Sequence, residues 1–267
     1  MAKIESDFFA GSRPRAFAHR GFSGKFPENT LPAFRAARQA GSPYIECDVH
    51  MTRDGAVVVH HDDDLRRTCG RDECIADLDY AALARADAGF TFSLDGNEFP
   101  FRGQGIRVPT LSEVLSAAAD CRFIIEIKQV KPSVVSAMFK VIDQAGMARR
   151  VLIASEHQEP LTEVRQLRPE IPTSFAAGEI AGFFQALATS ASDYRPPADA
   201  LQIPPVYETL RLATPESVAM AHRLGLEVHV WTVNEEAEMS ELLGIGIDGI
   251  ITNFPDRLLA LLPSVKS

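Results

Sequence analysis

The sequence alternates short runs of β-branched and other apolar residues with longer amphipathic stretches from one end to the other. This alternation is typical of strand–helix units whose strands run parallel. Eight runs are candidate parallel strands: 16–19, 44–49, 123–128, 151–154, 173–176, 200–203, 227–233 and 248–252. Eight strand–helix repeats predict an α/β fold of the closed (β/α)8 type, the TIM barrel, rather than an open sheet.

The stretches between these runs carry recognisable helix boundaries. A helix is predicted over about 30–40, ending before Gly41. Residues 110–113 (TLSE) form a predicted capping box. At 214–215 a threonine cap is followed by a first-turn proline. These local signals agree with the strand–helix alternation.

One apolar run does not fit the parallel repeat. Residues 56–62 follow the second predicted strand across the four residues 52–55, which are too few for a parallel crossover. We therefore predict an antiparallel hairpin with Asp54-Gly55 at its turn. Counting outward from that turn places Asp48 opposite His61, and a one-residue slip would still leave His61 beside Glu46 or Cys47. The hairpin is therefore expected to bring a histidine to two carboxylates, Glu46 and Asp48.

Residues 65–108 are the only long irregular piece of the sequence. Long loops in compact domains are usually functional or disordered, so this segment is predicted to be a small insertion over the barrel mouth. The expected domain organisation is a single barrel domain spanning 1–267, with no second domain.

Composition limits the partners and the location of the protein. The net charge of -9 argues against broad nucleic-acid binding, which needs a basic surface. No apolar segment has the length of a signal peptide or an integral membrane span, and the four cysteines form no C-x-x-C pair. We therefore expect a cytoplasmic protein with reduced thiols. The oligomeric state is left open.

Polar residues cluster where consecutive predicted strands end. They are His19 and Arg20 on the first strand, Glu46 and Asp48 on the second, Glu126 and Lys128 on the third, and His61 on the hairpin. Carboxyl ends of barrel strands converge on one mouth, so these side chains should meet there. Three buried carboxylates are costly unless a hard divalent cation lies among them, and oxygen ligands favour Mg²⁺ or Ca²⁺ over zinc.

Each residue also has a purely structural alternative. Glu126 and Lys128 could form a salt bridge in the barrel wall, and His19 could be a core histidine. Trp231 is expected to line the pocket near a strand exit, although packing is the alternative. His50, His157 and His222 are expected at the surface, and Arg66-Arg67 is expected to be a solvated pair.

The sequence resembles the glycerophosphodiester phosphodiesterase family. The motifs that carry the resemblance are His19-Arg20-Gly21, Pro27-Glu28-Asn29-Thr30, Glu46-x-Asp48-Val49, Thr52-x-Asp54-Gly55, His61-Asp62, Arg67-Thr68, Val108-Pro109-Thr110-Leu111, Glu126-Ile127-Lys128, Trp231-Thr232-Val233-Asn234 and Asp248-Gly249-Ile250-Ile251-Thr252-Asn253. They span nearly the whole chain in order. Two positions depart from the family pattern: His60 and Glu156 stand where apolar or aromatic residues are more usual.

The resemblance implies an enzyme that hydrolyses small glycerophosphodiesters to glycerol 3-phosphate and an alcohol. It implies one divalent cation, Ca²⁺ or Mg²⁺ with Mn²⁺ as a further candidate, held by Glu46, Asp48 and Glu126. It places His19 and His61 at the acid–base pair. It places Arg20 and Lys128 at positions that contact phosphate.

The chemistry of a phosphodiester agrees with this assignment but leaves choices open. Cleavage needs negative charge neutralised, a proton removed from the attacker and a proton given to the leaving alcohol. The sequence does not decide which histidine is the acid, or whether water or a glycerol hydroxyl attacks, the latter through a cyclic phosphate. The alternatives are a lysophospholipase D or phosphoinositide-type phospholipase, an enolase-type enzyme and a non-catalytic binding protein.

Overall fold

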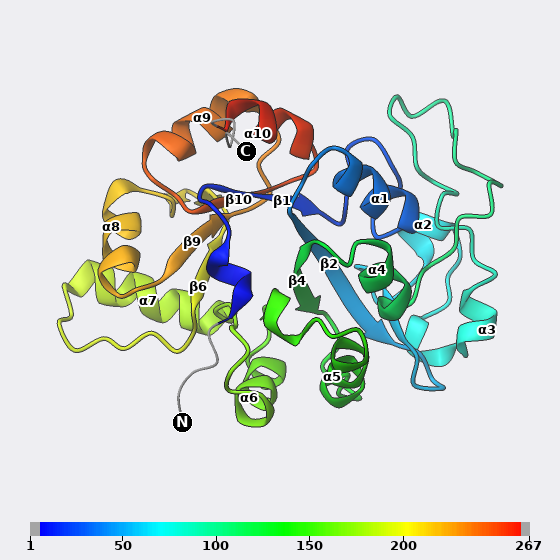
Figure 1. Cartoon of the computed structure of the whole chain (residues 1–267), viewed down its shortest axis with the longest axis horizontal. Helices are drawn as coiled ribbons and strands as arrows, with labels where there is room; N and C mark the ends of the chain where they lie inside the picture. The colour runs from blue at the N-terminus through cyan, green and yellow to red at the C-terminus, as the bar shows by residue number, and fades with distance from the viewer. Residues whose placement is uncertain (1–5, 263–267) are drawn as a thin grey trace.

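Seven parallel strands form the centre of the molecule in the computed structural model, which describes residues 6–262. The strands are β1 (Arg15–His19), β2 (Tyr44–Met51), β4 (Arg122–Ile127), β5 (Val151–Ala154), β6 (Ala200–Ile203), β9 (Glu227–Val230) and β10 (Gly249–Thr252). Their order around the sheet is β5-β4-β2-β1-β10-β9-β6 (Figure 1). The short strand β3 (Val57–Val59) pairs antiparallel with β2.

The ring closes between β5 and β6 through two isolated parallel bridges, Ile153 to Thr173 and Ser174 to Ala200. The predicted strand 173–176 is therefore reduced to two bridged residues. Pro172 has no backbone N–H to donate to a neighbouring strand. The backbone N–H of Thr173 donates to the Asp199 carboxylate instead of to a carbonyl of a neighbouring strand. The closed ring of parallel strands confirms the predicted (β/α)8 barrel.

Helices surround the strands in the order in which they follow them along the chain (Figure 1). They are α1 (Leu31–Gln39), α4 (Leu111–Ala117), α5 (Val135–Gln144), α6 (Gln158–Leu167), α7 (Ala177–Thr189), α8 (Pro215–Arg223), α9 (Glu236–Gly244) and α10 (Pro255–Leu261). The two predicted caps are confirmed: Thr214 caps α8, and Thr110 forms the capping box of α4 with Glu113. The helix predicted from about residue 30 begins at Leu31, with Thr30 as its cap.

One end of the barrel is plugged by the short helix η1 (Asp7–Ala10), which crosses in front of the strands in Figure 1. Its Phe8 is fully buried and packs on the rings of Phe17 and Tyr44. Because this apolar plug covers the amino-terminal ends of the strands, the carboxyl ends are left to form the mouth.

The β2–β3 hairpin is confirmed, but its predicted register is wrong by one residue. Val49 faces Val59, and the backbone N–H of His60 donates to the carbonyl of Asp48 over 3.0 Å. The cause is the loop, which has three residues rather than two: Thr52 pairs with Ala56, and Gly55 adopts φ +85°. Asp48 therefore faces His60, and His61 leaves the strand one residue later.

The segment 65–108 contains α2 (Arg66–Cys69), η2 (Ile75–Asp77) and α3 (Tyr80–Leu83) joined by loops. It lies at the right edge of the molecule in Figure 1. Leu65, Ile75, Leu83 and Val108 are buried together with Val58 of β3, so the segment packs on the hairpin. Its placement over the mouth and the single-domain organisation stay predictions.

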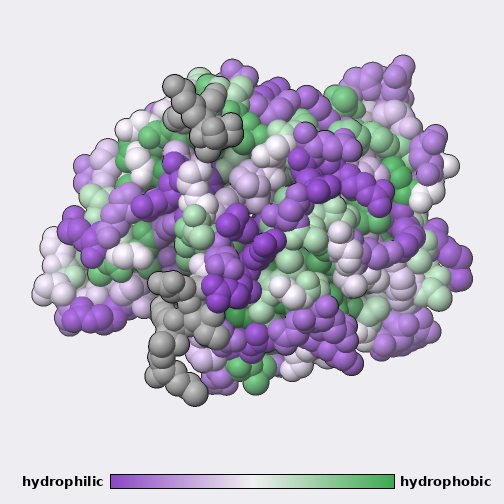
Figure 2. Space-filling model, in the orientation of Figure 1, coloured by the Kyte–Doolittle hydropathy of each residue, from purple (hydrophilic) through white to green (hydrophobic). Residues whose placement is uncertain are grey.

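The surface is mixed in character. Figure 2 shows hydrophilic and apolar residues intermixed over the face in view. The remaining elements are η3 (Ala148–Arg150) and a small hairpin of β7 (Val206–Tyr207) and β8 (Leu210–Arg211). Between residues 6 and 262, no helix combines the length and apolar character needed to cross a membrane.

Candidate active site

A tight turn after β1 places the first site residues. His19 is the last residue of the strand, and Arg20 and Gly21 follow with φ of +53° and +81°. A Cβ on Gly21 would lie 2.7 Å from the backbone carbonyl carbon of Ala33, so α1 approaches too closely for any side chain there. The turn directs the backbone N–H of Arg20 to Glu46 Oε2, 2.9 Å away.

Replacing Gly21 with alanine is expected to lower the free energy of unfolding by about 2–4 kcal/mol, because positive φ and the contact with Ala33 both oppose a Cβ. Gly41→Ala is the matched control. Gly41 has φ +87°, but a Cβ there meets nothing within 4 Å, so its loss should be only about 1 kcal/mol. Chemical unfolding of both variants measures the difference, and equal losses would contradict a role for the Ala33 contact.

Three carboxylates meet at the carboxyl ends of β2 and β4. The register pairs Asp48 with Glu126 across these strands, and pairs His19 of β1 with Glu46. One oxygen from each of Glu46, Asp48 and Glu126 lies within 4.8 Å of the others. Asp48 and Glu46 are 1% and 3% exposed, so the predicted acidic cluster is present and largely buried.

Two carboxylate oxygens of the cluster lack a hydrogen-bond partner in the described part of the chain, while other oxygens of the cluster accept hydrogen bonds from the Arg20 backbone N–H, Asn29 and Lys128. Glu46 Oε1 and Asp48 Oδ1 are buried and have no hydrogen-bond partner among residues 6–262. Burial, together with the charges of Asp48 and Glu126, raises the pKa of Glu46 well above its ordinary value. Burial and Asp48 also raise the pKa of Glu126. Acceptor oxygens that are close, buried and unsatisfied fit a hard divalent cation.

Two basic side chains border the cluster. Arg20 Nε lies 3.3 Å from Asp48 Oδ2, while Lys128 Nζ lies 2.7 Å from Glu126 Oε1 and 3.5 Å from Asp48 Oδ1. Burial opposes the charged form of Lys128, but the carboxylates of Glu126 and Asp48 outweigh it and raise the lysine pKa. Both groups therefore stay cationic where an anion would bind.

His19 is held from the β10 side of the mouth. Its Nδ1 lies 2.7 Å from Asn253 Oδ1, and its Nε2 lies 3.9 Å from Glu46 Oε2. Because an amide oxygen only accepts, Nδ1 carries the proton in this bond and Nε2 faces the pocket. Burial, followed by the charge of Arg20, lowers the pKa of His19 to about 4.

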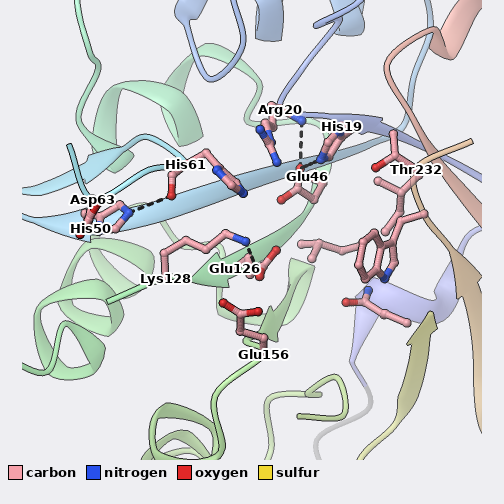
Figure 3. Close-up of a pocket in the computed structure, with 14 residues that line it drawn as sticks. His19, Arg20, Glu46, His50, His61, Asp63, Glu126, Lys128, Glu156 and Thr232 are labelled. Carbon is pink, nitrogen blue, oxygen red and sulfur yellow. Dashed lines mark hydrogen bonds and ion pairs between the residues drawn. The ribbon is translucent and has the colours of Figure 1, made fainter. Parts of the chain in front are cut away.

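His61 approaches from the hairpin. Its Nδ1 lies 2.6 Å from Asp62 Oδ1, and its backbone carbonyl lies 3.1 Å from His50 Nε2. In the view of Figure 3, His61 and His19 lie on either side of Glu46. The Asp62 carboxylate fixes the His61 ring so that its Nε2 is the free nitrogen.

Arg67 of α2 links the carboxylate that contacts Arg20 to the carboxylate that contacts His61. Its Nη1 and Nη2 each donate to Glu28 over 2.7 Å, and its Nε donates to Asp62 over 2.7 Å. Glu28 in turn accepts from Arg20 over 2.9 Å. Burial opposes ionisation of Glu28 and Asp62, but the hydrogen bonds from Arg67 lower the pKa of each to about 2. One guanidinium thus holds the carboxylates that orient Arg20 and His61.

Loss of the Arg67 side chain should therefore misplace both Arg20 and His61. We expect Arg67→Ala to lower kcat on a phosphodiester by about 10- to 100-fold, the range seen when groups supporting an active site are removed. Arg66→Ala is the control, because Arg66 is 69% exposed and pairs with Asp72. Steady-state kinetics of the two variants, with circular dichroism to check folding, makes the test. Wild-type kcat in Arg67→Ala would contradict the link.

Seven of the eight predicted site residues line one cavity of about 510 Å³. Those that line it are His19, Arg20, Glu46, His61, Glu126, Lys128 and Trp231. Asp48 lies beneath, in contact with Arg20 and Lys128. Figure 3 shows His19, Arg20, Glu46, His61, Glu126 and Lys128 converging on the pocket from strands and loops that are distant in sequence.

Several residues near the site were not assigned from sequence. His50 was expected at the surface but is 3% exposed and lines the cavity, because β2 runs on to Met51 and pairs His50 with Val58 of β3. Arg67 was expected to be solvated, yet it forms the contacts above. Asn29, whose Nδ2 donates to Asp48 over 2.8 Å, and Asn253 lay in quoted motifs without a role.

Comparisons with known proteins agree with the geometry. A glycerophosphodiester phosphodiesterase from Caldanaerobacter subterraneus is 32% identical over 91% of this chain and 96% of its own. One from Bacillus subtilis is 31% identical over 96% of this chain and 88% of its own. An Oleispira antarctica phosphodiesterase, solved with the product sn-glycerol-3-phosphate, is 26% identical with a TM-score of 0.75, covering 93% of this chain and 96% of its own. Residues 19–257 match the glycerophosphoryl diester phosphodiesterase family, and the chain belongs to that family.

Proposed function

We propose that this chain hydrolyses glycerophosphodiesters to glycerol 3-phosphate and an alcohol, using one divalent cation and the proton-transfer groups His19 and His61. The observation that carries the proposal is the cluster of Glu46, Asp48 and the half-buried Glu126, which each offer an oxygen within 4.8 Å of the others in the mouth of the barrel. The relatives named for this activity support it, as does the Oleispira complex with its product.

Glu46, Asp48 and Glu126 would hold the cation. Its oxygen donor set suits Ca²⁺, Mg²⁺ or Mn²⁺. When bound, the ion supplies positive charge that the phosphoryl oxygens of a diester need as charge shifts during cleavage. Arg20 and Lys128 add fixed positive charge at the same place and would contact the phosphate oxygens directly.

The two histidines would carry the protons. Each is hydrogen-bonded through Nδ1 to an acceptor, Asn253 for His19 and Asp62 for His61, so each presents Nε2. One Nε2 takes the proton of the attacking water or hydroxyl as the new P–O bond forms. The other gives a proton to the alcohol oxygen as its bond to phosphorus breaks.

The direct test is a panel of glycerophosphodiesters assayed after chelation and after separate re-addition of Ca²⁺, Mg²⁺ and Mn²⁺. We expect release of glycerol 3-phosphate to fall at least about tenfold on chelation and to return with at least one of these ions. Full activity of the chelated protein, verified as metal-free by elemental analysis, would contradict the metal dependence. No release from any diester would contradict the activity.

The lysophospholipase D and phosphoinositide-type alternatives are not favoured. The family matched by residues 19–257 and the relatives described above carry the glycerophosphodiester name. The same membership gives no support to an enolase-type reaction or to a non-catalytic binding protein.

A further inference from the structure

A second cavity lies directly beside the site. It has a volume of about 470 Å³ and shares Glu126, Glu156, Gln202 and Trp231 with the site cavity. The rest of its lining is largely apolar and includes Phe175, Ile180, Leu212 and Tyr207. A diester whose phosphate lies at the acidic cluster therefore has room for one of its two alcohol groups in this neighbouring space.

Glu156 is out of place in a pocket that binds an anion. Its side chain is 64% exposed, and among residues 6–262 its carboxylate makes one ion pair, at 3.5 Å with the adjacent His157. In Figure 3 it extends into the pocket below Glu126. The carboxylate repels a phosphate, so its presence weakens substrate binding unless another part of the substrate carries positive charge.

The backbone around Glu156 is held by hydrogen bonds to two neighbouring elements. Ser155 Oγ donates to the carbonyl of Ile127 over 2.7 Å, and the N–H of Ala177 donates to the carbonyl of Glu156 over 3.0 Å. These bonds tie the residue to β4 and to the start of α7. The backbone of Glu156 is thus held at the boundary between the two cavities, and its carboxylate lies within reach of both.

Trp231 lies at the same boundary. Its backbone N–H donates to the carbonyl of Ile203 over 3.0 Å, and its side chain is 43% exposed although it is the largest apolar group of the pocket. An indole face attracts cations, above all quaternary ammonium groups, whose methyl groups also pack on apolar walls.

We propose that Glu156 and Trp231 form a subsite for the alcohol half of the substrate and select alcohols with a quaternary ammonium group, as in choline. The proposal rests on the proposed phosphodiesterase function and adds a preference to it. The carboxylate and the indole recognise the cationic head, and the apolar wall of the second cavity accommodates its methyl groups.

A comparison of kcat/KM for two substrates tests the subsite. We expect the ratio of kcat/KM for glycerophosphocholine to kcat/KM for the uncharged-alcohol ester glycerophosphoglycerol to fall about tenfold in Glu156→Gln and in Trp231→Leu. Glu159→Gln removes an equal charge from the exposed first turn of α6 and should keep the wild-type ratio. An unchanged ratio in both site variants would overturn the proposal.

Tryptophan fluorescence gives a second measurement that does not depend on activity. Trp231 is the only tryptophan of the chain, so its emission reports on this subsite alone. Choline should change the emission of the wild-type protein saturably. Its uncharged isostere 3,3-dimethyl-1-butanol should bind the wild-type protein at least about tenfold more weakly than choline does. Choline should likewise bind Glu156→Gln at least about tenfold more weakly than it binds wild type. Equal binding of choline and the isostere would overturn the subsite.

The two measurements also separate this proposal from the proposed function. Wild-type protein that is inactive on both esters but binds choline through Glu156 would contradict the phosphodiesterase activity and support the subsite. Wild-type protein that cleaves both esters with no choline-dependent change in emission would support the activity and overturn the subsite.

Discussion

Replacing His19 or His61 with alanine is expected to lower turnover of glycerophosphodiesters by about 10²- to 10⁴-fold, the usual contribution of a positioned proton-transfer group. Both histidines line the cavity that also holds Glu46 and Glu126, and each presents Nε2 because Nδ1 is engaged. Alanine would remove the proposed proton carrier and leave the proposed cation ligands in place. Steady-state kinetics at saturating metal measures the effect.

His222→Asn is the control for this experiment. His222 is bonded to Asp248 over 2.8 Å and lines a separate cavity with Phe9 of the plugged barrel end. Its replacement should leave kcat at the wild-type value when the assay is run well below the unfolding temperature. If His19→Ala and His61→Ala both kept near-normal kcat with saturating metal, two-histidine catalysis would be wrong.

Neutralising the acidic cluster is expected to have opposite effects on activity and on stability. Glu46→Gln would remove one of the three proposed cation ligands, so activity at micromolar metal should fall by more than about 10²-fold. The same change removes a buried negative charge close to Asp48 and Glu126. The metal-free variant should therefore be more stable than metal-free wild type by about 1–3 kcal/mol at pH 7.

The pH dependence of folding stability tests whether the Glu46 carboxylate destabilises the metal-free protein. Burial and neighbouring charges raise the folded-state pKa of Glu46 above its ordinary value of 4.5, so the folded state binds the proton more tightly than the unfolded state. The contribution of Glu46 to the stability of the metal-free protein should then fall as pH rises above about 4.5, until the folded-state pKa is passed. His19, whose pKa is lowered, contributes in the opposite direction over part of this range, so the fall due to Glu46 is measured as the difference between wild type and Glu46→Gln. In Glu46→Gln this fall should be smaller. Denaturant unfolding at several pH values with excess chelator measures it, and an identical fall in both proteins would contradict the assignment.

The acidic cluster could be predicted from sequence because its geometry follows from strand periodicity. Residues two apart on a strand share a face, which fixes Glu46 beside Asp48. Parallel neighbours end at the same mouth, and the register places Asp48 directly beside Glu126. The barrel itself followed from the same regularity, because alternation of strand and helix leaves few closed arrangements.

The rest depended on contacts that no local pattern encodes. Arg67 contacts Glu28, 39 residues away in sequence, and nothing near Arg67 signals that partner. The one-residue shift of the hairpin came from Thr52 pairing with Ala56, a choice between two turn lengths that both suit Asp54-Gly55. The predicted strand at 173–176 was shortened by a bond to Asp199, a side chain from the next unit of the barrel.

The most direct measurement of the central claim is a crystal structure of the protein with Mn²⁺ and glycerol 3-phosphate, with the ion located by anomalous scattering. We predict one manganese peak within about 2.6 Å of oxygens from Glu46, Asp48 and Glu126. We also predict the phosphate beside it, within reach of Nε2 of both His19 and His61. A manganese peak away from these carboxylates, or a phosphate that neither histidine can reach, would contradict the account.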